Sequence, residues 1–371
     1  MKHVGKHISL LVFFSIVLAG LSSCAEKPEE TEIHELRAMH MDNLVEYGNY
    51  IYYPGGVDGM LRFDRRTNQI SSACTDPECT GNCLLKAPIM YFSQIANGRL
   101  YFASWAAHTH EYTYAYLDIQ TGKVVALREC EDIESTVGTA PFVDGDFCYY
   151  KRKILKPDGD PKNPDNYLTY LCRMPADGGD EEVLLELYGD SDMLLFVYQG
   201  QPVLFYDTQF SLFDPATKTR TVFFDLEEEG FGFLRGDMAM LDSKLYFLVQ
   251  KPVDVYLVSL DVLTGEYTTV VDVPVINFRI TDDKIYYCPA ESRTVANTNV
   301  NCSADLFCCN LDGSDPQVIY SNPSLDYTET FTVIDNKIYG WVGEFGSSVR
   351  HWGIIDIETK EVIHGQKEEI S

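Results

Sequence analysis

The sequence lacks the short motifs that identify the common enzyme classes. It has no Gly-x-Ser-x-Gly, no phosphate-binding loop, no glycine motif for dinucleotides and no His-Glu-x-x-His. Helical periodicity is almost absent after residue 40. Carboxylates are frequent, but most lie in turn-like segments, where Asp is favoured for backbone reasons. From the sequence we therefore expect no identifiable catalytic residue and no cofactor.

Basic residues are also scarce. The chain has 29 Lys and Arg against 56 Asp and Glu, which gives a formal net charge of −27. This charge repels the phosphates of nucleic acids and the headgroups of anionic lipids. We therefore expect no nucleic-acid partner, whereas cations, metals and neutral ligands stay open.

The N-terminus has the order of a secretory signal. Lys2 and Lys6 precede an apolar stretch, residues 8–21, which leads to Leu21-Ser22-Ser23-Cys24. This order resembles a bacterial lipobox, in which the cysteine is lipidated and becomes the first residue of the mature chain. We expect a signal peptide at 1–23 and attachment to the outside of the bacterial membrane through lipid on Cys24. An ordinary signal peptide or a short membrane anchor is the alternative, although the apolar stretch is short for a span.

One short phrase recurs along the rest of the chain. It is a turn of Asp, Gly, Asn or Lys followed by an aromatic and β-branched run, as in 283–287 and 335–339. This pattern predicts a tight hairpin turn that leads into a strand. The phrase occurs seven times, about 48 residues apart on average, and its anchor aromatics are Tyr52, Tyr101, Tyr149, Phe205, Tyr246, Tyr286 and Tyr339.

A second pattern follows each anchor. It is a strand that ends in a turn such as Asp-x-x-Thr-Gly at 118–122 or Asn-Leu-Asp-Gly-Ser at 310–314. Each unit therefore reads as four strands, A to D, and four strands at this period predict a propeller blade. We expect an all-β, seven-bladed β-propeller of four-stranded antiparallel blades over 40–365, after an acidic tether at 24–39. A β-sandwich or a β-helix is the alternative, and blade 4 is the weakest, because Pro202 and Val203 degrade its anchor.

These patterns resemble known propellers. The anchor phrase looks like the tyrosine-rich strand of receptor-type propellers related to the low-density-lipoprotein receptor, and the turn at 310–314 is similar to that of TolB-like propellers. Together with Cys74-Thr75-Asp76-Pro77-Glu78-Cys79 and Cys83, residues 40–365 resemble a family of uncharacterised bacterial lipoproteins with a propeller domain of unknown function. The resemblance implies the fold and the surface location, and it implies no known activity. The family pattern has a His shortly after the second Cys, but this chain has Thr80-Gly81-Asn82 at that place.

The cysteine cluster is the sharpest local feature. Cys74, Cys79 and Cys83 lie within ten residues, on the link between blades 1 and 2. A local disulfide with a further partner elsewhere, buried thiols, or a Zn²⁺ site completed by a fourth ligand are all open. Other cysteines are candidates for cross-strand disulfides or for small apolar core residues; these pairs are Cys148 with Cys172 in blade 3 and Cys288 with Cys308 in blade 6.

Strand alternation predicts one elaborated face. All B–C loops and all D–A links leave from the same side of a propeller, and the opposite side has only short turns. The long B–C loops are expected at 103–113, 151–166, 289–304 and 342–350, joined by the cysteine link 74–83 and the acidic link 227–230. Elaboration on one face marks the expected binding surface. The residues expected to bind a ligand there are Trp105, His108, His110, Trp341 and Arg350.

The sequence thus predicts a non-catalytic binding module for protein, peptide or carbohydrate at the cell surface. The alternative is an extracytoplasmic enzyme of glycosidase or lyase type built on the propeller. A buried carboxylate pair or a metal in the central channel would favour the enzyme, and an apolar or aromatic loop face would favour binding. A structural subunit of an envelope complex is a third possibility.

Overall fold

The structure is a computed structural model, and its described residues belong to one compact unit within Leu36–Ser371. They are residues 39–40, 44–55, 59–79, 83–86, 89–106, 111–129, 141–160, 163, 166–189, 191–281, 283–295, 298–302, 305–321, 325–326, 331–344, 350–364 and 366–367. Cys24, most of the tether, His108 and His110 lie outside these ranges. Within them, no helix is long and apolar enough to cross a membrane.

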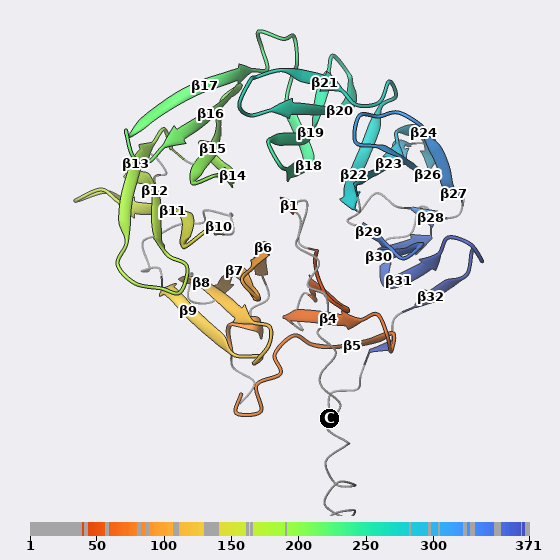
Figure 1. Ribbon diagram of the computed structural model, residues 1–371, viewed down its shortest axis with the longest axis horizontal. Coiled ribbons are helices and arrows are strands. Elements are labelled where there is room, and N and C mark those ends of the chain that lie inside the picture. The colour runs from red at the N-terminus through yellow and green to blue at the C-terminus, as the bar shows by residue number, and fades with distance from the viewer. Residues whose placement is uncertain are drawn as a thin grey trace, which may run out of the picture. The chain divides into compact units, whose positions relative to one another are not determined.

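Seven antiparallel sheets form a ring of blades around a central channel, so the predicted seven-bladed β-propeller is confirmed (Figure 1). Blade 1 consists of β2 (Val45–Tyr47), β3 (Tyr50–Pro54), β4 (Met60–Asp64) and β5 (Gln69–Ser72), and blade 2 of β6 (Ile89–Ala96), β7 (Arg99–Ala106), β8 (Glu111–Asp118) and β9 (Val124–Glu129). Blade 3 consists of β10 (Phe142–Asp144), β11 (Phe147–Leu155), β12 (Tyr167–Pro175) and β13 (Glu182–Leu187), and blade 4 of β14 (Met193–Tyr198), β15 (Gln201–Tyr206), β16 (Gln209–Asp214) and β17 (Thr219–Asp225). Blade 5 consists of β18 (Leu234–Leu241), β19 (Lys244–Lys251), β20 (Asp254–Asp261) and β21 (Tyr267–Thr269). Blade 6 consists of β22 (Val275–Thr281), β23 (Lys284–Pro289), β26 (Asp305–Asn310) and β27 (Gln317–Ser321), and blade 7 of β29 (Phe331–Ile334), β30 (Lys337–Glu344), β31 (Arg350–Asp356) and β32 (Val362–His364).

The recurring phrase is the A–B hairpin of each blade. At Asp335 and Asn336 both central residues have positive φ, 50° and 58°, and at Asn97 and Gly98 the values are 53° and 71°. Positive φ at both positions is the type I′ geometry, whose twist matches that of the flanking strands. The turn chemistry of the phrase therefore starts strand B at a fixed register in each blade.

The anchor aromatics pack blade on blade. Tyr101 donates a hydrogen bond of 3.0 Å to the carbonyl of Ala176 in blade 3, and Tyr149 reaches Gly200 of blade 4. The prediction is wrong in one blade, because Tyr286 is only half-buried and its neighbour Tyr287 takes the buried position. The anchors that are almost inaccessible to solvent are Tyr52, Tyr101, Tyr149, Tyr246 and Tyr339.

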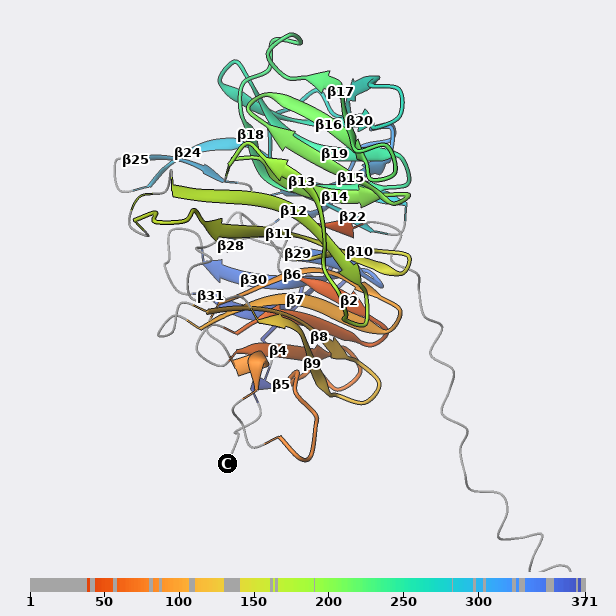
Figure 2. The ribbon, with the colours of Figure 1, turned by 90° about the vertical axis from the view of Figure 1, so that its left-hand side faces the viewer.

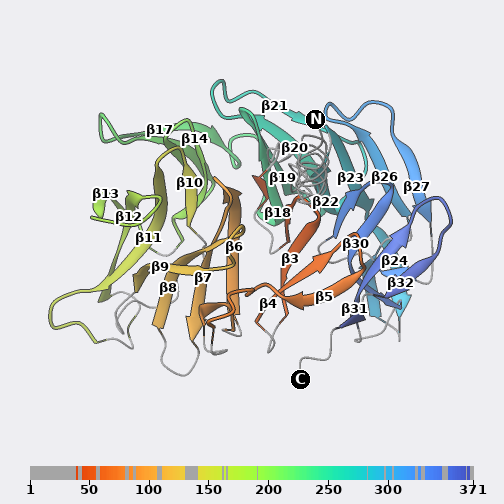
Figure 3. The same cartoon turned by 60° about the horizontal axis from the view of Figure 1, so that its bottom comes forward.

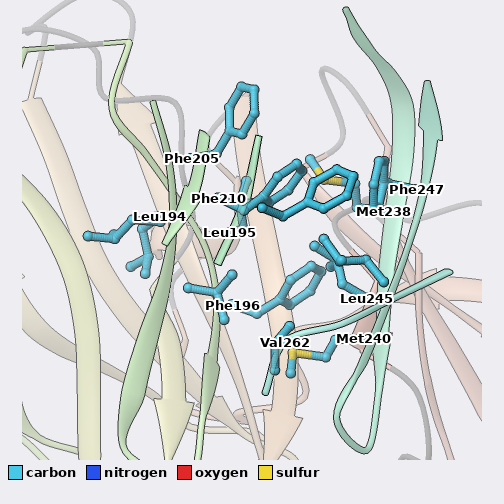
Figure 4. Close-up of a cluster of buried hydrophobic side chains, with 14 of the residues drawn as sticks. Leu194, Leu195, Phe196, Phe205, Phe210, Met238, Met240, Leu245, Phe247 and Val262 are labelled. Atoms are coloured by element: carbon cyan, nitrogen blue, oxygen red, sulfur yellow. The ribbon is translucent and has the colours of Figure 1, made fainter. Parts of the chain in front are cut away.

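Blade 4 is complete despite its weak phrase. Pro202 lies in β15 opposite Val197 of β14, and the ladder to β16 begins one residue later, at Val203. Phe196 and Phe210 are fully buried and pack against Phe247 and other residues of blade 5 (Figure 4). Burial of this apolar surface offsets the donor that the proline removes.

The C–D turns connect neighbouring blades at the outside of the ring. At Gly313 a Cβ atom would lie 1.7 Å from the carbonyl oxygen of Val270 in blade 5, and φ is +82°, so only glycine fits. In blade 7 the corresponding turn has Lys360, whose Nζ donates to the carbonyl of Ile319 in blade 6 at 3.2 Å. The turn of one blade thus rests on the outer strand of the preceding blade.

The four main strands of each blade come from one continuous stretch of chain, and blade 1 lies between blades 2 and 7 (Figure 3). Within the described residues, none of these main strands is exchanged between the first and the last blade. Instead, β33 (Gln366–Lys367) adds to the outer edge of blade 1, parallel to β5. The ring is therefore closed by side-chain packing and by this one short parallel pairing.

Two further segments were not expected from the sequence. A hairpin of β24 (Glu291–Val295) and β25 (Thr298–Cys302) lies inside the B–C segment of blade 6. It projects from the ring on the same side as the end of β11 and the start of β12 (Figure 2). In blade 7, β28 (Leu325–Asp326) pairs with the end of β30, beyond β29.

Candidate functional site

Three cysteine side chains meet in the link between blades 1 and 2. Cys74, Cys79 and Cys83 are half-buried thiols, and their Sγ atoms lie within 4.8 Å of one another. Cys74 and Cys83 pack against the apolar cluster that blades 1 and 2 share. Among the described residues, this is the one group of three or more His, Cys, Asp or Glu side chains whose ligand atoms come this close.

Local hydrogen bonds shape the link. The carboxylate of Asp76 accepts a bond of 2.9 Å from the amide of Glu78, and the Asp76 carbonyl accepts one of 3.1 Å from the amide of Cys79. The amide of Lys86 donates to the carbonyl of Cys83 at 3.0 Å and starts the short 3₁₀ helix η2 (Leu84–Lys86). Two turns therefore bring the second and third cysteines back toward the first.

Blade 1 fixes this link through a close backbone approach. Gly59 has φ +76°, and a Cβ atom there would lie 2.0 Å from the carbonyl oxygen of Leu85. Leu85 itself is 1 % exposed. Only glycine admits this contact, so the position of η2 follows from the sequence of blade 1.

The thiols are poor nucleophiles in this setting. Burial raises the pKa of Cys74 to about 12. Burial, and then the hydrogen bond to Cys79, raise the pKa of Cys83. The thiolate is the reactive form, so burial lowers the intrinsic reactivity of these two thiols.

The structure describes five further cysteine side chains, in blades 3 and 6, and forms no disulfide between them; Cys148, Cys172, Cys288 and Cys309 are buried, and Cys308 is half-buried. Cys148 pairs in register with Met174, and Cys172 pairs with Tyr150, so the two are offset and form no disulfide. Cys308 pairs with Tyr286 and is half-buried, while Cys309 is buried on the other face of its strand. The cross-strand disulfides considered from the sequence are wrong, because the register separates the partners.

The predicted ligand residues lie in strands more than in loops. Trp105 belongs to β7 and pairs with Tyr112, and Arg350 opens β31 opposite Gly343. In blades 2 and 7 the strands extend into 103–113 and 342–350, the two segments that the sequence predicts as loops. Hydrogen bonding between long antiparallel strands extended these blades, and the sequence pattern had placed the boundary too early.

Trp341 contributes to packing between blades. It lies opposite Trp352 in the register of blade 7 and is half-buried. Its ring meets Tyr53 of blade 1 edge-on, with centroids 6.0 Å apart, and Trp352 at 6.1 Å. Its large ring therefore stabilises the junction of blades 7 and 1.

The central channel contains a piece of the chain itself. β1 (Met39–His40) pairs with β18, the innermost strand of blade 5, on the edge that faces the channel (Figure 1). β1 also lies close to β6, the innermost strand of blade 2. From there the chain reaches Leu44, whose carbonyl accepts a hydrogen bond of 3.1 Å from Arg279 in blade 6.

Two carboxylates are engaged in ion pairs: Glu46 lies on the innermost strand of blade 1, and Asp192 pairs with a residue of β17, the outermost strand of blade 4. Glu46 of β2 lies 3.6 Å from Arg279 and accepts a hydrogen bond from Thr332 of blade 7. Asp192, the one fully buried carboxylate among the described residues, accepts a bond of 2.6 Å from Arg220. Each of these carboxylates is thus tied to an arginine.

A row of exposed apolar side chains lies on the face of the B–C loops and D–A links, hereafter the loop face. Tyr188, Phe233 and Val253 are 70 %, 73 % and 78 % exposed, and we call them the apolar row. Tyr188 packs against Tyr206 with ring centroids 4.9 Å apart, and Phe233 accepts a backbone bond from Gln250, three residues before Val253. The apolar row follows blades 4 and 5.

Sequence reasoning missed the apolar row because it weighed long loops. The three residues lie in short connections, and the B–C turn at Val253 has only Pro252 beside it between β19 and β20. The signal that could have found them is a large apolar residue directly after a turn-forming Gly or Pro, as in Gly232-Phe233 and Pro252-Val253. Such a position is solvent-facing unless something covers it.

Fold and site define a seven-bladed propeller with a thiol cluster between its first two blades. No protein-family model matches the chain, and no curated protein matches it. Among solved structures, the chain is similar to a prolyl endopeptidase, at a TM-score of 0.55 and 10 % identity, over 88 % of this chain and 50 % of that one. It is also similar to oligogalacturonate lyase from Vibrio parahaemolyticus, at a TM-score of 0.52 and 11 % identity, over 85 % and 88 % of the two chains.

A looser likeness links the chain to TolB from Acinetobacter baumannii, at a TM-score of 0.32 and 14 % identity, over 74 % of this chain and 67 % of that one. The chain spans half the length of the prolyl endopeptidase. At these identities the likenesses show the fold alone, because propellers of one architecture host many activities.

Proposed function

We propose that this chain is a non-catalytic binding module that recognises a protein, peptide or carbohydrate with its loop face. The observation that carries the proposal is the apolar row, in which Tyr188, Phe233 and Val253 are each 70 % exposed or more. Large apolar and aromatic groups in water gain free energy when a partner covers them, about 25 cal/mol per Å² of apolar surface. Blades 4 and 5 therefore offer the binding surface.

Polar groups beside the apolar row add selectivity. The guanidinium of Arg220 lies 5.4 Å from the centre of the Tyr188 ring, and Lys251 lies 5.0 Å from that of Phe231. The acidic link 227–230 joins them on the same face. An apolar centre with charged neighbours is the usual composition of a non-obligate interface.

The channel supports binding better than catalysis. The enzyme alternative needs a carboxylate pair or a metal in the channel, and β1 runs through that space. Glu46, on the innermost strand of blade 1, is tied to Arg279 of blade 6. The likeness to the lyase adds only the fold, so we do not extend that protein's activity to this chain.

The proposal includes attachment to the outside of the bacterial membrane through lipid on Cys24. It rests on the lipobox order at 21–24 and on the positive and apolar segments before it. Mass spectrometry of the mature N-terminus tests this part. An unmodified Cys24, or an N-terminus at another residue, contradicts it.

The binding part is tested with the full chain in detergent micelles, on arrays of glycans and of peptides. Val253→Asp places a charge in the apolar row, and Leu263→Asp is the matched control. Leu263 is 59 % exposed in the C–D turn of the same blade, on the opposite face. We expect ligands of the unmodified chain to be lost with Val253→Asp and kept with Leu263→Asp. Equal binding by both variants contradicts the proposal.

A further inference from the structure

The sulfur geometry of the cysteine link matches a metal ion. The Sγ atoms of Cys74, Cys79 and Cys83 lie within 4.8 Å of one another. In a tetrahedral zinc thiolate with Zn–S bonds of about 2.3 Å, the sulfurs are about 3.8 Å apart. Shifts smaller than about 1 Å therefore bring all three sulfurs to ligand distance.

The number of sulfurs also favours an ion over a cross-link. A disulfide takes two sulfurs at about 2.05 Å and leaves the third beside it. One ion takes all three at once. The other cysteines of the described strands belong to blades 3 and 6, away from the link between blades 1 and 2.

Hydrogen bonds from blades 1 and 2 hold the two ends of the link. Ser104 of β7 donates a hydrogen bond of 3.1 Å to the carbonyl of Leu84, next to Cys83. The amide of Cys74 donates to Ser72 at 3.2 Å, at the end of β5. Blades 1 and 2 thus fix the two ends of the link, and a site whose ligands are already placed loses little entropy on binding.

The surroundings favour a cation. Asp76 and Glu78 lie between the first two cysteines, and the chain as a whole carries a charge of −27. Cys74, Cys79 and Cys83 are all partly exposed. A bound ion would therefore have protein on one side and water on the other.

We propose that Cys74, Cys79 and Cys83 bind one Zn²⁺ ion, with the fourth coordination position open to solvent. Thiolate sulfur selects thiophilic ions over Ca²⁺ and Mg²⁺, which require oxygen ligands. The ion ties the two ends and the middle of the link to one another, at the junction of blades 1 and 2. The open position accepts water or a donor atom from outside the protein.

The test uses the full chain, purified in detergent under reducing conditions and stripped of metal with a chelator. It is titrated with Zn²⁺, and in parallel with Co²⁺, whose sulfur-to-cobalt charge-transfer absorption reports thiolate ligation. Cys79→Ser removes one ligand, and Cys308→Ser removes a half-buried thiol of blade 6 as the control. We expect about one Zn²⁺ per chain in the unmodified protein and in Cys308→Ser, and binding weaker by about tenfold or more in Cys79→Ser.

A second measurement does not depend on the variants. Zn²⁺ raises the thermal midpoint of the unmodified chain, because an ion that binds only the folded state stabilises it. The proposal is overturned if the reduced chain binds no Zn²⁺, if Co²⁺ gives no charge-transfer band, or if Cys79→Ser binds as tightly as the control. Peptide mapping that finds a disulfide among the three cysteines in protein taken from cells overturns it as well.

Discussion

Tyr53 of blade 1 and Trp352 of blade 7 stack face to face, with ring centroids 4.1 Å apart and 2° between the ring planes. Tyr53 is 1 % exposed and Trp352 4 %. They belong to the first and the last blade, and they lie in an apolar cluster that joins these two blades, in which Phe63 also packs against Tyr339. The stack is therefore one of the contacts that close the ring.

Removing the indole should open this junction. We expect Trp352→Ala to lower the free energy of unfolding by about 3–5 kcal/mol, as large core truncations do. Trp341→Ala is the comparison at the edge of the same junction, because Trp341 is only half-buried, and we expect a loss of about 1–2 kcal/mol. Urea denaturation followed by far-ultraviolet circular dichroism measures both. Equal losses would mean that the stack does not close the ring.

The Asp192–Arg220 pair should be costly to break from one side. Asp192 is 0 % exposed and the side chain of Arg220 is 15 % exposed. Arg220→Met leaves the carboxylate buried without its cation, and we expect a loss of about 3–5 kcal/mol. Lys218→Met breaks the half-exposed pair with Glu182 and should cost less than about 1 kcal/mol. Chemical denaturation compares the two, and a small effect of Arg220→Met would show that water reaches Asp192.

A side chain at Gly313 should separate blades 5 and 6. A Cβ atom there meets the carbonyl oxygen of Val270, whereas at Gly145, also at positive φ, it meets nothing within 4 Å. Gly145→Ala should cost about 1–2 kcal/mol for its left-handed backbone alone. Gly313→Ala should cost about 1–3 kcal/mol more, from overpacking. Thermal unfolding measures the difference, and equal midpoints would contradict the close approach.

Low pH should lower the stability of the fold, because it protonates aspartates in the C–D turns. Hydrogen bonds from Thr121, Ala216, Ser314 and Thr359 hold the pKa of their turn aspartates below its usual range; these are Asp118, Asp214, Asp312 and Asp356. The unfolded chain then binds more protons than the folded one, so this stabilisation is present above the unfolded pKa of about 3.9 and is lost as pH falls through the lower folded pKa.

The measurement is the thermal midpoint between neutral pH and about pH 2. We expect a plateau above about pH 5 and a fall below about pH 4. A variant with all four aspartates changed to Asn keeps the acceptor oxygens and removes the titration. Its midpoint should fall less steeply in acid, and an unchanged slope would assign the acid sensitivity to other groups.

The blades could be predicted because their signals are local. A type I′ turn and an alternating aromatic run specify a hairpin within ten residues of chain, as at Asp335 and Tyr339. The number of copies of this phrase then predicts the number of blades. The exception, Tyr286, shows where the local signal ends: which of two adjacent tyrosines is buried depends on the neighbouring blade.

Contacts between residues that are far apart in the sequence have no comparable local signal. The pairing of Met39 with Met240 joins two segments that are far apart in the sequence, and a strand of two residues carries no periodic pattern. The convergence of Cys74, Cys79 and Cys83 was open between three kinds of site, because spacing alone does not place sulfurs in space. Tertiary contacts, such as the one between Gly59 and Leu85, determine where the three sulfurs lie.

The uninterrupted blades have a consequence for biosynthesis. A blade whose four main strands are consecutive can pair them as soon as its own residues have left the ribosome or the translocation channel. Blade 1 should therefore fold against blade 2 long before its other neighbour exists. The residues of β1 must wait for blade 5, and the Tyr53 ring waits for Trp352, which follows it by 299 residues in the sequence. Truncation near the C-terminus should thus leave a chain of folded blades that cannot join end to end.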